Sequence, residues 1–229
     1  MHQPAPRPSL LFDLDGTLLD TDHLHLEAWN EALGAIGIPP LDAATYRAEV
    51  MGRPNAQITP GLLPGADDAA RGALADAKEA RFRARLDATL APLPGLARLL
   101  DAAEAAGIAK AVVTNAPRAN ALAMLRGLGW ETRFEVLVIG DELPRLKPDP
   151  LPYITAMQLL GVPASHAVAF EDSPSGLQAA AGSGAFAVGI ATTLDAATLE
   201  AAGARLVVRD FTDPALGALL RARVGLSLG

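Results

Sequence analysis

The stretch Leu10-Leu-Phe-Asp-Leu-Asp-Gly-Thr-Leu-Leu-Asp-Thr21 carries the most informative pattern in the chain. Its three apolar residues predict a buried strand that leads straight into Asp13 and Asp15. The i, i+2 spacing at a strand end projects both carboxylates toward the same side, and Gly16 then lets the backbone turn tightly. In an open α/β sheet, ligands bind at the carboxyl ends of the strands. We therefore expect Asp13 and Asp15 to belong to a binding or catalytic site.

Further apolar runs of strand length follow, and stretches rich in Ala and Leu alternate with the later ones. The candidate strands are Leu10–Phe12, Ile108–Val113, Val136–Ile139, Ala167–Phe170, Ala185–Ile190 and Leu206–Val208. The candidate helices are Leu96–Ala106, Ala119–Leu128, Pro152–Leu160, Ser175–Gly182, Asp195–Ala202 and Pro214–Arg223. Such alternation indicates βαβ units. We predict an α/β fold with a Rossmann-like parallel sheet.

One connection is much longer than the others. The first strand ends near Phe12 and the next begins near Ile108, whereas a whole βαβ unit takes about 30 to 50 residues. The excess contains helix-like segments and no convincing strand, with breaks at Pro39-Pro40 and from Pro60 to Gly65. We predict an inserted α-helical cap domain at residues 19–91, and a core formed by residues 1–18 and 92–229.

Composition limits the possible functions of this 229-residue chain. Its formal charge of −7 disfavours nucleic-acid binding, which needs a basic face. It has no Cys, which excludes disulfides and thiolate chemistry. The Pro-rich residues 1–8 lack an apolar signal core, and no segment reaches the roughly 18 apolar residues of a membrane helix. We expect a cytoplasmic protein without a membrane partner, present as a monomer or weak homodimer.

A second acidic pair, Glu171-Asp172, follows the apolar run Ala167–Phe170. On its own, Asp172 or the next residue, Ser173, could simply cap the helix that begins there. Together with the first pair it brings up to four carboxylates to one edge of the sheet. That many acids repel one another unless a cation lies between them, and Mg²⁺ suits a site of oxygen ligands. The two pairs therefore predict a magnesium site.

Two further polar elements follow or lie between strands. Thr114 and Asn115 close the second strand before a helix, so the Thr hydroxyl and nearby N–H groups could hold a phosphate oxygen; a cap is the alternative. Lys147 lies in Arg145-Leu-Lys-Pro-Asp-Pro150, where prolines stiffen the backbone. The chain has only three Lys against sixteen Arg, which favours a role for the compact charge of Lys147.

These elements resemble, in their order and spacing, the four signature motifs of the haloacid dehalogenase superfamily. They are Asp-Leu-Asp-Gly-Thr-Leu, a strand-end Thr, a Lys-Pro in a loop and a strand-end Glu-Asp, and they extend from residue 9 to about residue 190. A cap between the first and second motifs is similar to the helical-cap subfamily. That subfamily includes β-phosphoglucomutase, phosphoglycolate phosphatase and sugar-phosphate phosphatases.

The resemblance implies a role for each matching residue. Asp13 would be the nucleophile that forms an aspartyl-phosphate, and Asp15 the general acid and then the base for water. Thr114 and Lys147 would hold the transferring phosphoryl group. The implied Mg²⁺ ligands are Asp13, the backbone carbonyl of Asp15, Asp172 and, directly or through water, Glu171.

Several residues of the predicted cap resemble substrate contacts in the family. His25 matches the hinge histidine of β-phosphoglucomutase, but it could instead pack near Trp29. Lys78 resembles that enzyme's cap lysine, but with Arg81, Arg83 and Arg85 it could also form a solvated basic face. The cap arginine of the mutase aligns with Asn55, and Arg53 could substitute for it. The cap candidates for substrate contact are therefore His25, Arg53 and Lys78.

The combined expectation is a Mg²⁺-dependent phosphatase that acts on a small phosphorylated metabolite, of the sugar-phosphate or phosphoglycolate type, through an aspartyl-phosphate. A hexose-phosphate mutase of the β-phosphoglucomutase type is the alternative enzyme. A catalytically silent binding protein would have lost at least one motif, whereas all four are present. The expected binding residues at the phosphate are Thr114, Asn115 and Lys147.

Overall fold

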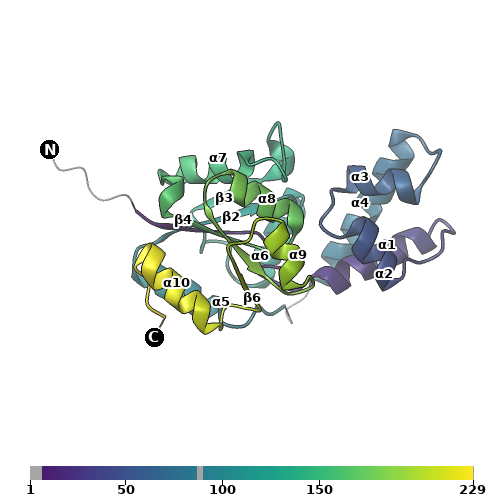
Figure 1. Cartoon of the computed structure of the whole chain (residues 1–229). Coiled ribbons are helices and arrows are strands. Elements are labelled where there is room, and N and C mark those ends of the chain that lie inside the picture. The colour runs from purple at the N-terminus through teal and green to yellow at the C-terminus, as the bar shows by residue number, and fades with distance from the viewer. Residues whose placement is uncertain (1–6, 87–89, 229) are drawn as a thin grey trace.

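A computed structural model describes residues 7–86 and 90–228 of the chain. The first six residues of the Pro-rich start, and residues 87–89 of the predicted cap, lie outside it. A six-stranded parallel sheet forms the centre of the molecule (Figure 1). Its strands are β1 (Ser9–Phe12), β2 (Ala109–Thr114), β3 (Val136–Ile139), β4 (Ala167–Glu171), β5 (Phe186–Ile190) and β6 (Leu206–Val208). Each predicted strand is confirmed to within one residue at either end.

Helices cover the sheet and also form a separate group beside it (Figure 1). The sheet helices are α5 (Leu96–Ala105), α6 (Arg118–Gly127), α7 (Leu151–Leu160), α8 (Pro174–Gly182), α9 (Ala196–Ala201) and α10 (Pro214–Val224). Between β1 and β2 lie α1 (Asp22–Gly34), α2 (Ala43–Thr45), a π-helical turn (Tyr46–Val50), α3 (Asn55–Leu62) and α4 (Asp68–Arg85). We call residues 22–86 the helical insertion; within them the structure has no strand, as predicted.

The strand order β3-β2-β1-β4-β5-β6 places β1 at the centre of the sheet. The chain runs outward from β1 to β3 on one side and from β4 to β6 on the other, so the order reverses beside β1. Such a reversal leaves a crevice at the carboxyl ends of the strands. Phe12 is paired with Phe170, and the N–H of Asp13 donates to the carbonyl of Phe170 over 3.0 Å. This register brings Asp13 level with Glu171.

Alternate residues of the strands belong to two apolar clusters, one on each face of the sheet. Leu10 and Phe12 pack with side chains of α5, α6 and α10, whereas Leu11 packs with side chains of α7 and α8. Both faces are covered, which explains why the strands are nearly continuous apolar runs. The buried sheet therefore provides a rigid base for the groups at its carboxyl edge.

The helical insertion has an apolar cluster of its own. Trp29 and Leu33 of α1 pack there with Tyr46, Ile58 and Leu74. The predicted break from Pro60 to Gly65 begins later than expected, because α3 continues through Pro60 to Leu62 and the chain is non-helical from there until α4 begins at Asp68. Pro60 lacks the N–H that would donate a hydrogen bond within the helix. Burial of its neighbours Ile58 and Thr59 stabilises α3.

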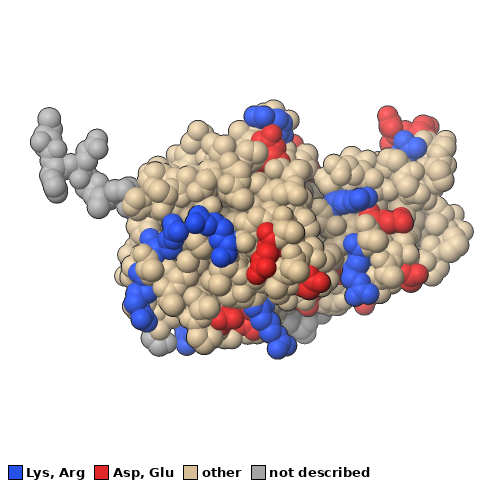
Figure 2. All heavy atoms as spheres, in the orientation of Figure 1, with Lys and Arg blue, Asp and Glu red and all other residues tan. Residues whose placement is uncertain are grey.

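Charged side chains are scattered over the face shown in Figure 2, with one group of basic residues on the sheet part of the molecule. In that part the guanidinium groups of Arg205 and Arg223 both lie over the ring of Phe186, at 4.6 and 4.4 Å from its centroid. Within the described ranges, none of the helices combines the length and apolar character that crossing a membrane requires.

Candidate active site

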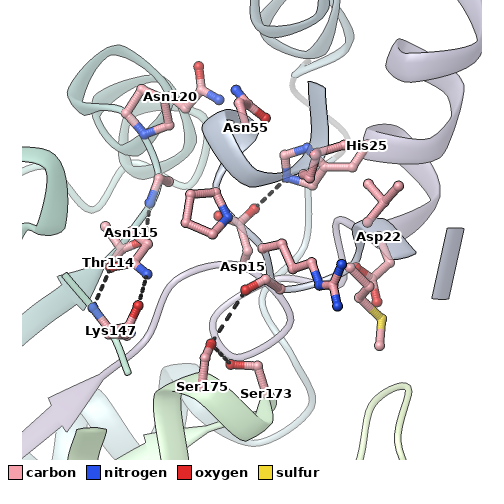
Figure 3. Close-up of a pocket in the computed structure, with 18 of the residues that line it drawn as sticks. Asp15, Asp22, His25, Asn55, Thr114, Asn115, Asn120, Lys147, Ser173 and Ser175 are labelled. Atoms are coloured by element: carbon pink, nitrogen blue, oxygen red, sulfur yellow. Dashed lines mark hydrogen bonds and ion pairs between the residues drawn. The ribbon is translucent and has the colours of Figure 1, made fainter. Parts of the chain in front are cut away.

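A cavity of about 250 Å³ lies between the carboxyl edge of the sheet and the helical insertion. Asp13, Thr114, Lys147 and Asp172 contribute its sheet side, and residues of α1, α3 and α4 line the other side. The sequence motifs are thus brought to one place by the sheet, although the first and the last, at Asp13 and Asp172, are 159 residues apart in the chain. Figure 3 shows how the labelled side chains surround the cavity.

Lys147 is the buried cation at the base of this cavity. Its Nζ atom lies 2.6 Å from Oδ1 of Asp13 and 2.6 Å from Oε1 of Glu171, and it also donates to the carbonyl of Val113. Its side chain is only 3% exposed. Burial alone would lower the pKa of Lys147, but the charges of Asp13 and Glu171 raise it above its ordinary value. Lys147 therefore remains an ammonium group that pairs with both acids.

Glu171 is fully buried at the end of β4 and is held by a second donor. The hydroxyl of Tyr153, on α7, donates to its Oε1 atom over 2.5 Å. A Cβ atom at Gly176 would overlap the Glu171 carboxylate, so only glycine fits at that position of α8. Ser173 accepts the N–H of Gly176 and caps α8, as one of the two capping alternatives predicted.

Asp13, Glu171 and Asp172 form a cluster that fits a metal ion, since a ligand oxygen from each lies within 4.8 Å of the others. Burial raises the pKa of Asp13 to about 8 and, with the charges of Asp13 and Glu171, raises that of Asp172 well above its usual range. These carboxyl groups thus lack sufficient positive charge around them, which a divalent cation would supply. Gly16, with φ of +70°, leaves the room that Asp172 needs.

Asp13 and Asp15 line the same cavity, as expected, but the Asp15 carboxylate does not belong to this cluster. β1 ends at Phe12, so the alternation of a strand does not extend to Asp15. Its Oδ1 atom accepts hydrogen bonds from the Thr21 hydroxyl at 2.7 Å and from Nε2 of His25 at 3.0 Å. Although burial opposes it, the contact with His25 lowers the pKa of Asp15, which therefore stays ionised.

His25 links Asp15 to Lys78. Its ring stacks on Phe82 with centroids 3.8 Å apart, and its Nδ1 atom lies 2.8 Å from Nζ of Lys78. Because the ammonium group can only donate, Nδ1 accepts and Nε2 carries the proton donated to Asp15. The alternative that Lys78 lies on a solvated face is wrong: the side chain is 4% exposed, because α4 packs it against α1.

Glu79 links side chains of the helical insertion to a side chain of the sheet part of the molecule. Its Oε1 atom accepts from Lys78 at 2.9 Å and from Asn55 at 2.6 Å, and its Oε2 atom accepts from Asn120 of α6 at 2.5 Å. Asn120 in turn accepts from Arg83 of α4 at 2.8 Å. The amide of Asn120 therefore links two side chains of α4, Glu79 and Arg83, to helix α6.

Thr114 and Asn115 lie on the sheet side of the cavity, as expected. The Thr114 hydroxyl accepts the N–H of Ala116 over 2.9 Å. The predicted capping alternative is wrong, because α6 has Pro117 as its N-cap and no side-chain cap. The Asn115 side chain bonds both the N–H and the carbonyl of Lys147, at 3.2 and 3.1 Å. Its amide therefore orients the Lys147 loop, while the neighbouring backbone faces the cavity.

Arg53 also lines the cavity, and its exposed guanidinium donates to the carbonyl of Glu49 over 3.3 Å. The predicted residues Asp13, Asp15, His25, Arg53, Lys78, Thr114, Asn115, Lys147 and Asp172 all line this one cavity, and Glu171 lies buried beneath it. Sequence reasoning missed Glu79, Asn120 and Tyr153. No motif surrounds them; a polar residue facing the apolar side of a helical pattern is the only signal that they offer.

A doubly wound sheet with a carboxylate cluster and a buried ammonium at its carboxyl edge is typical of an α/β enzyme whose active site lies at that edge. The chain belongs to the haloacid dehalogenase-like hydrolases, because the model of that family matches residues 9–184. The resemblance in the sequence is thereby confirmed.

Named relatives agree with this assignment. Validoxylamine A 7'-phosphate phosphatase from Streptomyces hygroscopicus subsp. limoneus is 35% identical over 209 residues, which cover 89% of this chain and 93% of the relative. Phosphoglycolate phosphatase from Xylella fastidiosa is 38% identical over 176 residues, with 77% and 76% covered. A crystal structure of CbbY from Rhodobacter sphaeroides in complex with phosphate has a TM-score of 0.79 and 31% identity, and covers 90% of this chain and 96% of that one.

Proposed function

We propose that this enzyme is a Mg²⁺-dependent phosphatase that hydrolyses a small phosphate monoester, of the sugar-phosphate or phosphoglycolate type, through an aspartyl-phosphate. The observation that carries the proposal is the placement of Asp13, at the end of the central strand, against both Lys147 and the carboxylates Glu171 and Asp172. The relatives named as phosphatases support the reaction class.

In the first step, an oxygen of Asp13 attacks phosphorus and the bond to the leaving oxygen breaks. Lys147 favours the ionised form of Asp13, against the effect of burial, and neutralises the charge of the phosphoryl oxygens, while Thr114 donates its hydroxyl to one of them. Asp15, ionised in the free enzyme, takes up a proton when the substrate binds and gives this proton to the leaving oxygen. In the second step the Asp15 carboxylate takes a proton from water, which attacks phosphorus and releases phosphate and Asp13.

Asp13, Glu171, Asp172 and the backbone carbonyl of Asp15 would hold Mg²⁺. When bound, the ion supplies positive charge beside the transferring phosphoryl group. His25 and Thr21 orient Asp15 for both proton transfers. The helical insertion acts as the cap domain proposed at residues 19–91, and its closure excludes water before Asp13 is phosphorylated.

The test measures phosphate release from p-nitrophenyl phosphate, with Mg²⁺ and with EDTA. Asp13→Asn is expected to lower kcat by at least about 1,000-fold, since the nucleophile is lost. Acid-quenched wild-type enzyme should yield a phosphorylated peptide that contains Asp13. Full activity of Asp13→Asn, or hydrolysis that does not depend on Mg²⁺, would refute the proposal.

A hexose-phosphate mutase of the β-phosphoglucomutase type is a second candidate, favoured by the contact of Lys78 with His25 and of His25 with Asp15. Asn55 stands against it, because this position holds the mutase's phosphate-binding arginine in the resemblance. β-Glucose 1-phosphate with a bisphosphate primer separates the two candidates. A phosphatase releases phosphate, whereas a mutase forms glucose 6-phosphate.

A further inference from the structure

One side of the cavity is formed by side chains that do not contact the carboxylate cluster. We call Asn55, Lys78, Glu79, Asn120 and Asp141 the leaving-group wall; all five line the same cavity as Asp13. In Figure 3, Asn55 and Asn120 lie on the far side of the cavity from Ser173 and Ser175. A substrate whose phosphate sits at Asp13 would extend its remaining atoms toward these groups.

The only cation of this wall is already neutralised. Nζ of Lys78 lies 2.9 Å from Oε1 of Glu79, and both side chains are less than 10% exposed. Although burial opposes it, Lys78 and the donors Asn55 and Asn120 lower the pKa of Glu79, so its carboxylate is ionised in this pair. The ammonium of Lys78 is therefore not free to attract a second anion.

The remaining groups of the wall are mainly hydrogen-bond acceptors. The Asn120 nitrogen donates one hydrogen to Glu79 and its oxygen accepts from Arg83. Asn55 donates one hydrogen to Glu79, and within residues 7–86 and 90–228 nothing donates to its oxygen. Nothing in these ranges donates to the carboxylate of Asp141 either, whose pKa is raised by partial burial and by the charge of Glu79. The wall thus offers acceptors and a net negative charge.

We propose that the leaving-group wall selects a phosphate ester of a hydroxyl-rich leaving group that is uncharged or cationic, a sugar or amino sugar phosphate, and rejects one with a second anionic group. Hydroxyl and ammonium groups donate to the free acceptors, whereas a carboxylate or second phosphate would lie against Glu79 and Asp141. This inference rests on the proposed phosphatase function and narrows its substrate class to sugar phosphates.

The positive charge of Arg53 would favour an anionic leaving group, which is the opposite of what the leaving-group wall would select. Arg53 is an exposed cation on the cavity lining, next to Gly52, whose carbonyl accepts from Ser175 of α8. If Arg53 rather than the wall controlled selectivity, an anionic leaving group would be preferred and Arg53→Ala would remove that preference.

The test uses three substrates of equal carbon number: glucose 6-phosphate, glucosamine 6-phosphate and 6-phosphogluconate. For the wild-type enzyme in Mg²⁺, kcat/KM for 6-phosphogluconate should be at least about tenfold below that for glucose 6-phosphate, because like charges face each other. Glucosamine 6-phosphate should match or exceed glucose 6-phosphate. A preference for 6-phosphogluconate, or for 2-phosphoglycolate, overturns the inference.

Glu79→Gln and Asp141→Asn each remove one charge of the wall. Both should lower the ratio of kcat/KM for glucose 6-phosphate over 6-phosphogluconate, by at least about fivefold for Glu79→Gln. Asp76→Asn, an exposed acid of α4 outside the cavity, is the matched control and should leave the ratio unchanged. Because Asp141 is exposed, Asp141→Asn keeps the test valid even if Glu79→Gln misfolds.

The outcomes separate the two proposals. Unchanged ratios in both variants overturn the role of the wall while the phosphatase function stands. Absence of phosphate release from every ester, p-nitrophenyl phosphate included, overturns the phosphatase function itself.

Discussion

The hydroxyl of Tyr153 and the ammonium of Lys147 donate to the same oxygen atom, Oε1 of Glu171, at 2.5 and 2.6 Å. Tyr153 lies on α7 and Lys147 in the loop before it, so a single carboxylate oxygen binds side chains from two neighbouring parts of the chain. Because Glu171 is fully buried, these donors replace the water that it loses on folding.

Tyr153→Phe is expected to lower the free energy of unfolding by about 1.5 to 3 kcal/mol, the cost of losing a hydrogen bond to a buried charge. It should also lower kcat by about 10- to 100-fold, because Glu171 loses part of its orientation. Urea denaturation and phosphate release check both effects. Unchanged stability together with unchanged kcat would show that the hydroxyl contributes nothing to Glu171.

Lys147→Met should destabilise the protein by about 3 to 5 kcal/mol in EDTA, because it leaves Asp13 and Glu171 buried without their cation. With saturating Mg²⁺ the loss should be smaller, since the ion supplies positive charge to the same carboxylates. Urea denaturation under both conditions measures the difference. An equal loss with and without Mg²⁺ would contradict the proposed metal site.

Stability in EDTA should fall as the pH rises from about 4 to 8. Burial raises the pKa of Asp13 to about 8 in the folded protein, whereas an unfolded Asp titrates near 4. The folded state therefore binds more protons across this range, so its stabilisation is complete below about pH 4 and is lost as the pH rises through about 8. Urea denaturation at several pH values checks the slope, which Asp13→Asn and saturating Mg²⁺ should each reduce.

Gly176→Ala should lower activity by at least about 100-fold, because the new Cβ atom would overlap the Glu171 carboxylate and displace it. Gly217→Ala on α10 is the matched control, since its Cβ would meet nothing within 4 Å. The control should keep full activity and gain about 0.5 to 1 kcal/mol of stability from helix propensity. Equal activities of the two variants would refute the steric argument.

The strands and the residues that follow them could be predicted because both depend on local sequence. Apolar runs mark the buried strands, and parallel pairing brings the carboxyl ends of β1, β2 and β4 together. Asp13, Thr114 and Asp172 were therefore predictable site residues. The hydrogen-bond partners of Asp15 were not predictable, because they include His25, which lies on α1.

The polar contacts of the insertion could not be derived from sequence for a related reason. Asn120 and Glu79 lie 41 residues apart on helices that meet only in the folded protein. Nothing in the local pattern of α4 distinguishes Lys78 and Glu79, which are buried, from Asp76 and Arg83, which are less so. Such contacts depend on how the insertion packs against the sheet.

The separate apolar cluster of the helical insertion has a consequence for how this enzyme can diverge. Asp13 is attached to the central, most protected strand, whereas Asn55 and Glu79 are carried by helices supported by Trp29, Leu33 and Ile58. Substitutions in that cluster would shift the groups facing the leaving group without disturbing the strand ends. Selection could thus alter the substrate range in one part of the protein while the reaction chemistry is inherited unchanged in the other.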